Sequence, residues 1–439
     1  MNKEKLCQHL SGMIKIPTVT YFDREKEDEE IFESFADYLR ETYPLIHQKA
    51  SFSKVGKRGL LYCLRGGEKS CVLMAHYDVV PANEDDWSFK PFSGTIDNSY
   101  VYGRGTIDTK SSLCCTMEAV ENALKEGKKL VYTIYLAFSG EEEVEGESSN
   151  DMMKALKEKG IHPEFVLDEG GAVIPEGLPG VPERAAMIGI AEKGVVNIKM
   201  SVKGKEGHAS TPPKHTAAGT LSAAVTKIEN HPFKSRLTPA TRAMFSIIGR
   251  KRGGVVGLLF KNAKILKPGI SFLAGKMGGT FNAMMRTTTA VTMLEASPSY
   301  NILPSEASAG INLRLLYGDT KKSAIEYMQK IVNNPDIQFE IVSGSDPSPV
   351  SEITGESWQI LTDTIDKTWP GILTAPYTLN GGTDSRFWHT ICSHVYKFTP
   401  MQMDASVRAT VHGIDEKIKI DHLIEMASFY EHLIDKLSE

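Results

Sequence analysis

Hydrophobic and polar positions follow two different periods up to about residue 190. Amphipathic runs with helical spacing cover residues 24–42 and 110–126, whereas short apolar runs of strand length cover residues 71–75 and 130–138. Strands separated by helices of this length are typical of a mostly parallel sheet that helices cover on both faces. The pattern therefore predicts an α/β fold for this part of the chain.

The pattern changes near residue 194. Residues 194–204 and 307–318 alternate apolar and polar positions, which is typical of strands with one buried face. Helical runs return at residues 355–368 and 419–437. The glycine-rich segment 252–279 is expected to be a loop.

These changes predict the domain organisation. We expect a catalytic domain in two parts, residues 1–193 and 344–439, with a smaller α+β domain inserted at residues 194–343. A chain of 439 residues is also too long for one ordinary domain, which agrees with this division.

Composition excludes several classes of protein. The formal net charge of -5 leaves no basic excess for binding nucleic acid. The sequence has neither the apolar core of a signal peptide nor an apolar run long enough to span a membrane, so we expect a cytoplasmic protein with no membrane partner. The six cysteines lack the spacing of a disulfide framework or a zinc knuckle.

Ionisable residues follow three of the predicted strands. The polar residues that come directly after these apolar runs are His76 and Asp78, then Glu141, Glu142 and Glu143, then Asp168 and Glu169. Because the carboxyl ends of parallel strands form one edge of a sheet, we expect these side chains to lie close together. Taken singly, each has a simpler interpretation as a solvated strand end or charge run.

Two further segments, "YGRGTIDTK" with Asp108 and "TVHGIDE" with His412, add a carboxylate and an imidazole. So many carboxylates in one crevice would repel one another unless cations bind there. Nitrogen and oxygen ligands without thiolate suit zinc, and also cobalt or manganese. The sequence therefore predicts two divalent metal ions, an arrangement that hydrolases use.

The motifs "HYDVVP", "YGRGTIDTK", "SGEEEVEG", "VLDEGG", "GHAS", "YNILPSEA", "GGTDSR" and "VHGIDE" occur in this order. The ordered set closely resembles the aminoacylase/carboxypeptidase family of di-zinc metallopeptidases, which includes glutamate carboxypeptidase, dipeptidases and N-acyl amino acid deacylases. The resemblance implies a zinc-exopeptidase-like catalytic domain with an inserted lid or dimerisation domain. It makes a homodimer one expectation, and a lid that closes over the chain's own site the other.

The resemblance also implies roles for individual residues. The metal ligands would be His76, Asp108 as the bridging carboxylate, Glu143, Asp168 and His412, with Glu169 as the alternative to Asp168. Asp78 would accept the N–H of His76 and fix its tautomer. Glu142 would be the general base, because an unliganded carboxylate beside a liganded one can carry a proton. Glu141 stands where the family more often has Asp, so the alignment of this run could shift by one residue.

Residues outside the metal ligands would bind the substrate. In the resemblance, His208 stabilises the oxyanion, and Asn301 and Arg314 hold the substrate. Gly381, Gly382 and Thr383 resemble a loop whose backbone N–H groups bind the terminal carboxylate. Simpler interpretations are a solvent-facing strand arginine for Arg314 and an ordinary turn for the glycines.

The expected function is hydrolysis of a peptide or amide bond next to a free C-terminal carboxylate, by a carboxypeptidase or dipeptidase. The substrate would be a small peptide or an N-acyl amino acid, and an N-acyl amino acid deacylase is the alternative. A more distant alternative is a metal-binding protein that has lost turnover. A phosphate-binding loop and a serine nucleophile elbow are not indicated, because the glycine and serine patterns that they need are absent from the sequence.

Overall fold

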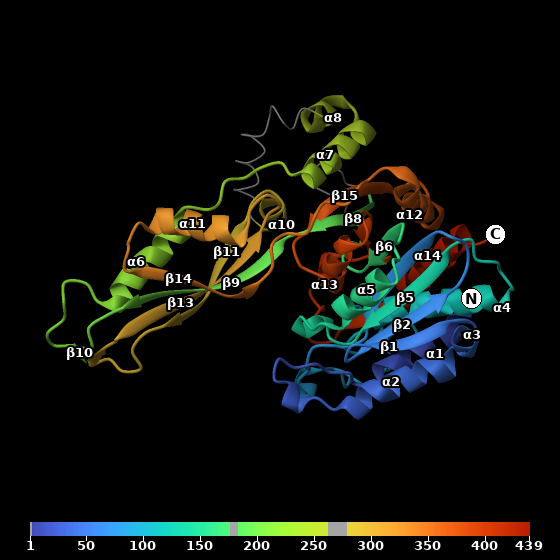
Figure 1. Cartoon of the computed structure of the whole chain (residues 1–439), viewed down its shortest axis with the longest axis horizontal. Coiled ribbons are helices and arrows are strands. Elements are labelled where there is room, and N and C mark those ends of the chain that lie inside the picture. The colour runs from blue at the N-terminus through green and yellow to red at the C-terminus, as the bar shows by residue number, and fades with distance from the viewer. Residues whose placement is uncertain (1, 176–182, 262–278) are drawn as a thin grey trace. The chain divides into compact units, whose positions relative to one another are not determined.

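A computed structural model describes residues 2–175, 183–261 and 279–439 of the chain (Figure 1). It divides into two compact units. The first contains residues up to Ile190 together with Ser351–Pro376 and Thr383–Glu439, and the second contains Ala191–Val350 and Tyr377–Gly382. The limits predicted for the inserted domain, residues 194 and 343, fall inside the second unit.

The first unit is built on a nine-stranded sheet, counted over the described residues. Its centre is parallel, since β3 (Ser70–His76) runs parallel to β5 (Thr133–Ser139) and β6 (Phe165–Asp168), and β6 runs parallel to β16 (Val395–Lys397). The main strand order is β1-β2-β5-β3-β6-β16-β8-β15. The remaining strands are β1 (Ser51–Val55), β2 (Gly59–Leu64), β7 (Val173–Ile174), β8 (Ala185–Glu192) and β15 (Leu373–Leu379).

This register aligns the carboxyl ends of the central strands. His76 pairs with Ser139 across β3 and β5, and Asp168 pairs with Lys397 across β6 and β16. All seven residues of β3 are buried, as expected for a strand that is covered on both faces. The predicted mostly parallel α/β sheet is confirmed, and its ligand edge is the one at which His76 and Asp168 stand.

Helices pack on this sheet in two groups. Helix α4 (Lys110–Lys125) packs on β3, and α1 (Lys3–Ile14) and α14 (Ile420–Lys436) pack on α4. Helix α5 (Ser148–Glu158) packs on β2 and β5, and its Met152, Met153 and Leu156 share a core with Val72 and Met74 of β3. The other helices of this unit are α2 (Glu29–Thr42), α3 (Pro44–Lys49), α12 (Gly355–Thr368) and α13 (Ala405–Arg408).

The second unit carries a four-stranded antiparallel sheet in the order β11-β13-β9-β14. Its strands are β11 (Thr288–Glu295), β13 (Glu306–Leu315), β9 (Gly194–Lys203) and β14 (Ile337–Gly344). Alternate residues of β9 are buried against α6 (Ala217–Asn230) and α11 (Lys321–Val332), as the alternating pattern predicts. Short strands β10 (Gly207–His208) and β12 (Ile302–Leu303) pair beside them.

Two sequence predictions differ from the structure. The helix expected from residue 24 begins at Glu29, because the Asp28 side chain accepts the N–H of Glu30 and caps it there; residues 24–26 form a single 3₁₀ turn. The loop expected at residues 252–279 is partly helical. Helix α7 (Pro239–Arg252) is followed by α8 (Gly254–Lys261), helix α10 (Gly279–Ala283) follows later, and residues 262–278 lie outside the described chain.

Among the described helices, none combines the length and the apolar character that a membrane span requires.

Candidate metal centre

The first element of the site is the end of strand β3. His76 lies buried with its Nδ1 3.0 Å from the backbone oxygen of Asp78 and 3.4 Å from the Asp78 carboxylate. This contact leaves Nε2 of the imidazole directed at Asp108 Oδ1, 2.9 Å away. The arrangement is the one in which a carboxylate or carbonyl oxygen orients a metal-binding imidazole.

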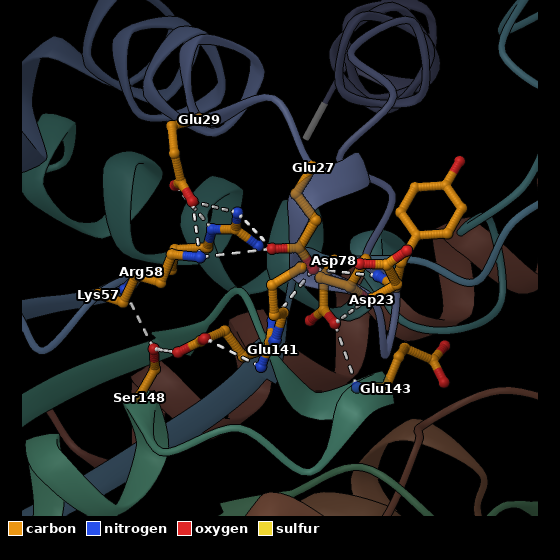
Figure 2. Close-up of polar contacts among 12 residues, drawn as sticks. Asp23, Glu27, Glu29, Lys57, Arg58, Asp78, Glu141, Glu143 and Ser148 are labelled. Atoms are coloured by element: carbon orange, nitrogen blue, oxygen red, sulfur yellow. Dashed lines mark hydrogen bonds and ion pairs between the residues drawn. The ribbon is translucent and has the colours of Figure 1, made fainter.

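Asp78 also fixes the turn that follows β5. Its two carboxylate oxygens accept the backbone N–H groups of Glu142 and Glu143, both at 3.1 Å, and Oδ2 accepts the Thr20 hydroxyl at 2.9 Å. Figure 2 shows the hydrogen bond from the Glu143 backbone to the Asp78 carboxylate, with the Glu143 side chain extending away from it. Because Asp78 is fully buried, its carboxylate holds two adjacent glutamates in fixed positions.

Glycine is required just before this turn. A Cβ atom added at Gly140 would lie 2.6 Å from the Tyr77 ring, whose hydroxyl donates a hydrogen bond to the backbone oxygen of Arg58. Only glycine lets the chain pass this close to a buried ring.

Asp108 lies at the centre of the cluster, on the loop between β4 (Tyr100–Tyr102) and α4. One of its carboxylate oxygens faces His76, and the other lies 3.1 Å from Nε2 of His412. Among the described residues, two sets of three candidate ligand atoms result, and in each set all atoms lie within 4.8 Å of one another. The sets are His76, Asp108 and Glu169, and Asp108, Glu143 and His412.

The electrostatics of the cluster fit a pair of cations. Burial raises the pKa of the Glu142, Glu143 and Glu169 carboxyl groups, and neighbouring carboxylates raise it further. Hydrogen bonds with Asp108 and Glu143 raise the pKa of His412 to about 10. The raised carboxyl pKa values show that this buried site disfavours several negative charges together, and divalent ions would offset those charges. The donor set contains nitrogen and oxygen without thiolate, which suits zinc, cobalt or manganese.

The structure separates Asp168 from Glu169. Glu169 Oε1 lies 3.4 Å from His76 Nε2 and belongs to a set of candidate ligands, whereas Asp168, which the sequence interpretation favoured, belongs to neither set. The Asp168 carboxylate instead accepts the backbone N–H of Ser385 at 3.0 Å. Consecutive residues at a strand end direct their side chains to opposite sides, so one position in the sequence decides which carboxylate faces the cluster.

Glu141 is buried on the other side of the turn. Its carboxylate accepts the Ser148 hydroxyl and lies 3.2 Å from Arg24. Ser148 also accepts the backbone N–H of Arg58, and the Arg58 guanidinium binds Glu27 and Glu29 (Figure 2). Glu141 therefore belongs to a polar network behind the turn. The next two residues face the cluster instead: Glu142 interacts electrostatically with His76 and Glu169, and Glu143 lies 3.1 Å from His412.

Sequence reasoning missed the residues that support the site. Thr20, Arg24 and Arg58 carry no motif, and only their buried partners identify them. Arg104 and Glu416 stand inside the segments "YGRGTIDTK" and "VHGIDE" but were not singled out. They form a buried ion pair at 2.7 Å.

The predicted substrate-binding residues lie mainly in the second unit. His208 is exposed and its Nδ1 lies 2.7 Å from the Ser210 hydroxyl, while the backbone oxygen of Asn301 accepts the N–H of Ala209. Arg314 is half-buried on β13, and its Nε donates to Asn312 at 3.2 Å.

Gly381 and Gly382 follow β15, and the Thr383 hydroxyl accepts the N–H of Ser385 at the start of a 3₁₀ turn. A Cβ atom added at Gly381 would have no neighbour within 4 Å, so packing does not require glycine there.

Comparisons with known proteins identify the family of this chain and several relatives. Residues 72–436 match the family described as Peptidase family M20/M25/M40. The chain is 34% identical over 440 residues to "Probable carboxypeptidase S-like 2" of Dictyostelium discoideum, covering 98% of this chain and 84% of that protein. It is 31% identical over 434 residues to "N-fatty-acyl-amino acid synthase/hydrolase PM20D1" of Homo sapiens, covering 97% and 86%.

A solved structure has the same fold. The M20 family metallo-carboxypeptidase Sso-CP2 from Sulfolobus solfataricus superposes with a TM-score of 0.72 at 17% identity, covering 100% of this chain and 99% of that chain.

Proposed function

Because the chain belongs to Peptidase family M20/M25/M40, we propose that it is a di-metal hydrolase that cleaves a peptide or amide bond next to a free C-terminal carboxylate. The observation that carries this proposal is Asp108, whose two carboxylate oxygens face two different imidazoles within two three-residue sets of metal ligands. A carboxylate shared in this way is typical of two-metal hydrolases.

The residues present fit two divalent ions. His76, Asp108 and Glu169 would hold one ion, and Asp108, Glu143 and His412 the other. Bound ions would polarise the substrate carbonyl and make water a stronger nucleophile. We propose zinc for both positions, with cobalt or manganese as substitutes that the same ligands accept.

Glu142 would carry the proton. Its carboxylate belongs to neither set of ligands, while its backbone N–H is held by Asp78. Burial raises the pKa of Glu142, so the side chain can accept a proton from the attacking water and return it to the departing nitrogen. Glu143, one residue further, would be committed to the metal and could not share this task.

We propose that the second unit supplies the contacts to the substrate. Arg314 has the planar guanidinium that binds a carboxylate through two parallel hydrogen bonds. His208 and Asn301 lie close together because the backbone N–H of Ala209, the residue after His208, donates a hydrogen bond to the backbone oxygen of Asn301. His208 would donate a hydrogen bond to the oxyanion. Backbone N–H groups near Gly381, Gly382 and Thr383 would complete the binding of the terminal carboxylate.

The substrate class follows from the relatives as a proposal. A carboxypeptidase or dipeptidase agrees with the carboxypeptidase S-like protein of Dictyostelium discoideum and with the metallo-carboxypeptidase structure. The human relative, whose name states hydrolysis of N-fatty-acyl amino acids, supports the second candidate, an N-acyl amino acid deacylase. Both reactions release an amino acid with a free carboxylate. A cytoplasmic location and a homodimer remain predictions from the sequence.

The experiment is amine release from three groups of substrates: dipeptides, longer peptides and N-acyl amino acids. Each is measured with chelator-treated protein and with protein reconstituted with zinc, cobalt or manganese. The proposal expects turnover only after reconstitution, and the preferred group decides between peptidase and deacylase. Turnover by fully metal-free protein would contradict it.

A further inference from the structure

Two of the proposed metal ligands stand on loops that leave the same end of one pair of strands. Strand β4 pairs with β17 (Lys417–Lys419) in antiparallel register, with Tyr102 opposite Lys417. The loop that carries Asp108 follows β4, and the loop that carries His412 precedes β17. Gly103 and Glu416, the residues just beyond this pair of strands, continue the register: the N–H of Gly103 donates to the backbone oxygen of Glu416 at 2.9 Å.

The side chain of Glu416 joins the two loops. Its Oε1 accepts the backbone N–H groups of Gly105, Ile107 and Asp108, at 3.1, 2.8 and 3.3 Å. Its Oε2 accepts a hydrogen bond from the Arg104 guanidinium at 2.7 Å. Glu416 is fully buried, so a carboxylate on the His412 loop organises the backbone of the Asp108 loop away from water.

Arg104 makes the reciprocal connection. One of its nitrogens binds Glu416, and another donates to the backbone oxygen of Gly413, the residue after His412, at 3.0 Å. The guanidinium is buried and lies 5.2 Å from the centre of the Trp87 ring, within the range of a cation–π contact. His412 itself is half-exposed and has a positive φ of 58°. Its loop therefore depends on such contacts for its shape.

We propose that Arg104 and Glu416, here called the Arg104–Glu416 clamp, position Asp108 and His412 so that the metal-binding sets are formed before metal arrives. The inference rests on the proposed function, since it assigns these two ligands to metal. Both members of the clamp are positioning residues, because they act through the backbones of the ligand loops. Asp108 also lies against the buried His76 at the end of β3, whereas His412 is half-exposed and contacts Asp108 and Glu143 through Nε2, at the tip of its ring. Loss of the clamp therefore affects the His412 set more than the His76 set.

The test uses adjacent carboxylates of the same loop. Glu416→Gln replaces one acceptor oxygen by an amide donor, which then opposes either Arg104 or the three backbone N–H groups. Asp415→Asn is the matched control: Asp415 is only partly buried and binds Ser88 on a different segment, at 2.7 and 2.8 Å. The full-length proteins are stripped with chelator and titrated with zinc and with cobalt, whose absorption spectrum reports each ion bound.

The clamp predicts that the weaker of two metal-binding steps loses about 10- to 100-fold in affinity in Glu416→Gln, with a changed cobalt spectrum for that step. Asp415→Asn is expected to stay within about threefold of the unchanged protein in both steps. Arg104→Lys keeps the charge that pairs with Glu416 and loses the second bond to Gly413, so it should weaken the same step by less. Equal affinities in all three variants would overturn the proposal.

A measurement on metal-free protein separates this inference from the proposed function. Backbone hydrogen exchange across residues 409–416 should be faster in Glu416→Gln than in Asp415→Asn, because the loop opens more readily without the clamp. Equal exchange would overturn the clamp even if the enzyme were active. If the unchanged protein bound fewer than two ions, the di-metal proposal would fail, while this exchange measurement would still decide whether the clamp orders the loop. If Glu416→Gln does not fold, Arg104→Lys carries both measurements.

Discussion

Replacing Asp78 by Asn tests how the buried Asp78 carboxylate controls the turn that carries Glu142 and Glu143. Asp78 is fully buried, and its two oxygens accept the N–H groups of Glu142 and Glu143 and the hydroxyl of Thr20. Asn keeps the shape but turns one oxygen into an N–H donor. In either orientation of the amide, one backbone N–H of the turn then faces another donor, and the remaining bond loses its charge.

The magnitude follows from these contacts. A hydrogen bond to a charged group contributes about 1.5–3 kcal/mol. Losing one such bond and weakening a second therefore costs about 2–4 kcal/mol. If this cost appears fully in the transition state, kcat/KM falls by about 30- to 1,000-fold, since each 1.36 kcal/mol is about tenfold. Thr20→Val is the matched control, because it removes one of the donors to the same carboxylate but leaves the charge and both backbone bonds of the turn in place, so kcat/KM is expected to fall less than in Asp78→Asn.

The assay is kcat/KM on the preferred substrate for both variants, beside the metal content of each preparation. The reasoning would be refuted if Asp78→Asn kept two bound ions and a kcat/KM within about threefold of that of the unchanged protein, because the turn would then not depend on the buried charge. A loss in Thr20→Val as large as in Asp78→Asn would also refute it.

Three further outcomes are expected. Glu169→Gln should weaken metal binding by about 10- to 100-fold, whereas Asp168→Asn should weaken it much less. Competition with a chelator measures both affinities, and a larger loss in Asp168→Asn would favour Asp168 as the ligand. Arg58→Met removes the buried guanidinium that pairs with the buried Glu27 carboxylate, and it should lower the free energy of unfolding by about 3–5 kcal/mol. Lys57→Met, at a side chain that is 44% exposed, should cost less than about 1 kcal/mol, and equal melting temperatures of the two variants would contradict this. Hydrogen-bonded carboxylates raise the pKa of His412 to about 10, so zinc must displace a proton from His412 at neutral pH. The affinity for zinc should therefore rise by up to about tenfold per pH unit between about pH 6 and 8. An affinity that does not change with pH would count against His412 as a ligand.

The sheet and its polar edge could be predicted from the sequence because they depend on local patterns. The apolar run before His76 and the polar residues after β5 and β6 are each continuous in the chain, and the parallel pairing that aligns them follows from the helices between them. The alternating residues of β9 likewise report a strand with one buried face.

The choice between Asp168 and Glu169 could not be made in the same way. Strand β6 ends at Asp168, and a shift of one residue reverses which carboxylate faces the cluster. The sequence does not fix the end of a strand to within one residue. The Asp168 contact with Ser385 joins residues that are distant in the chain, so the sequence pattern gives no sign of it.

Supporting residues escaped prediction because their partners are distant in sequence. Arg58 binds Glu27 and Glu29, and Arg104 binds Glu416, and none of these pairs has helical or strand spacing. A buried charge is recognised only when the fold brings its partner to it.

The most direct test of the account is amine release by Glu142→Gln beside Glu145→Gln, each reconstituted with metal. Glu145 lies in the same acidic run but is exposed, so it serves as the control. The account predicts that Glu142→Gln binds two ions like the unchanged protein and loses turnover by at least about 100-fold, while Glu145→Gln stays active. Full activity of Glu142→Gln with two ions bound would contradict the assignment of the proton carrier and, with it, the central claim about this site.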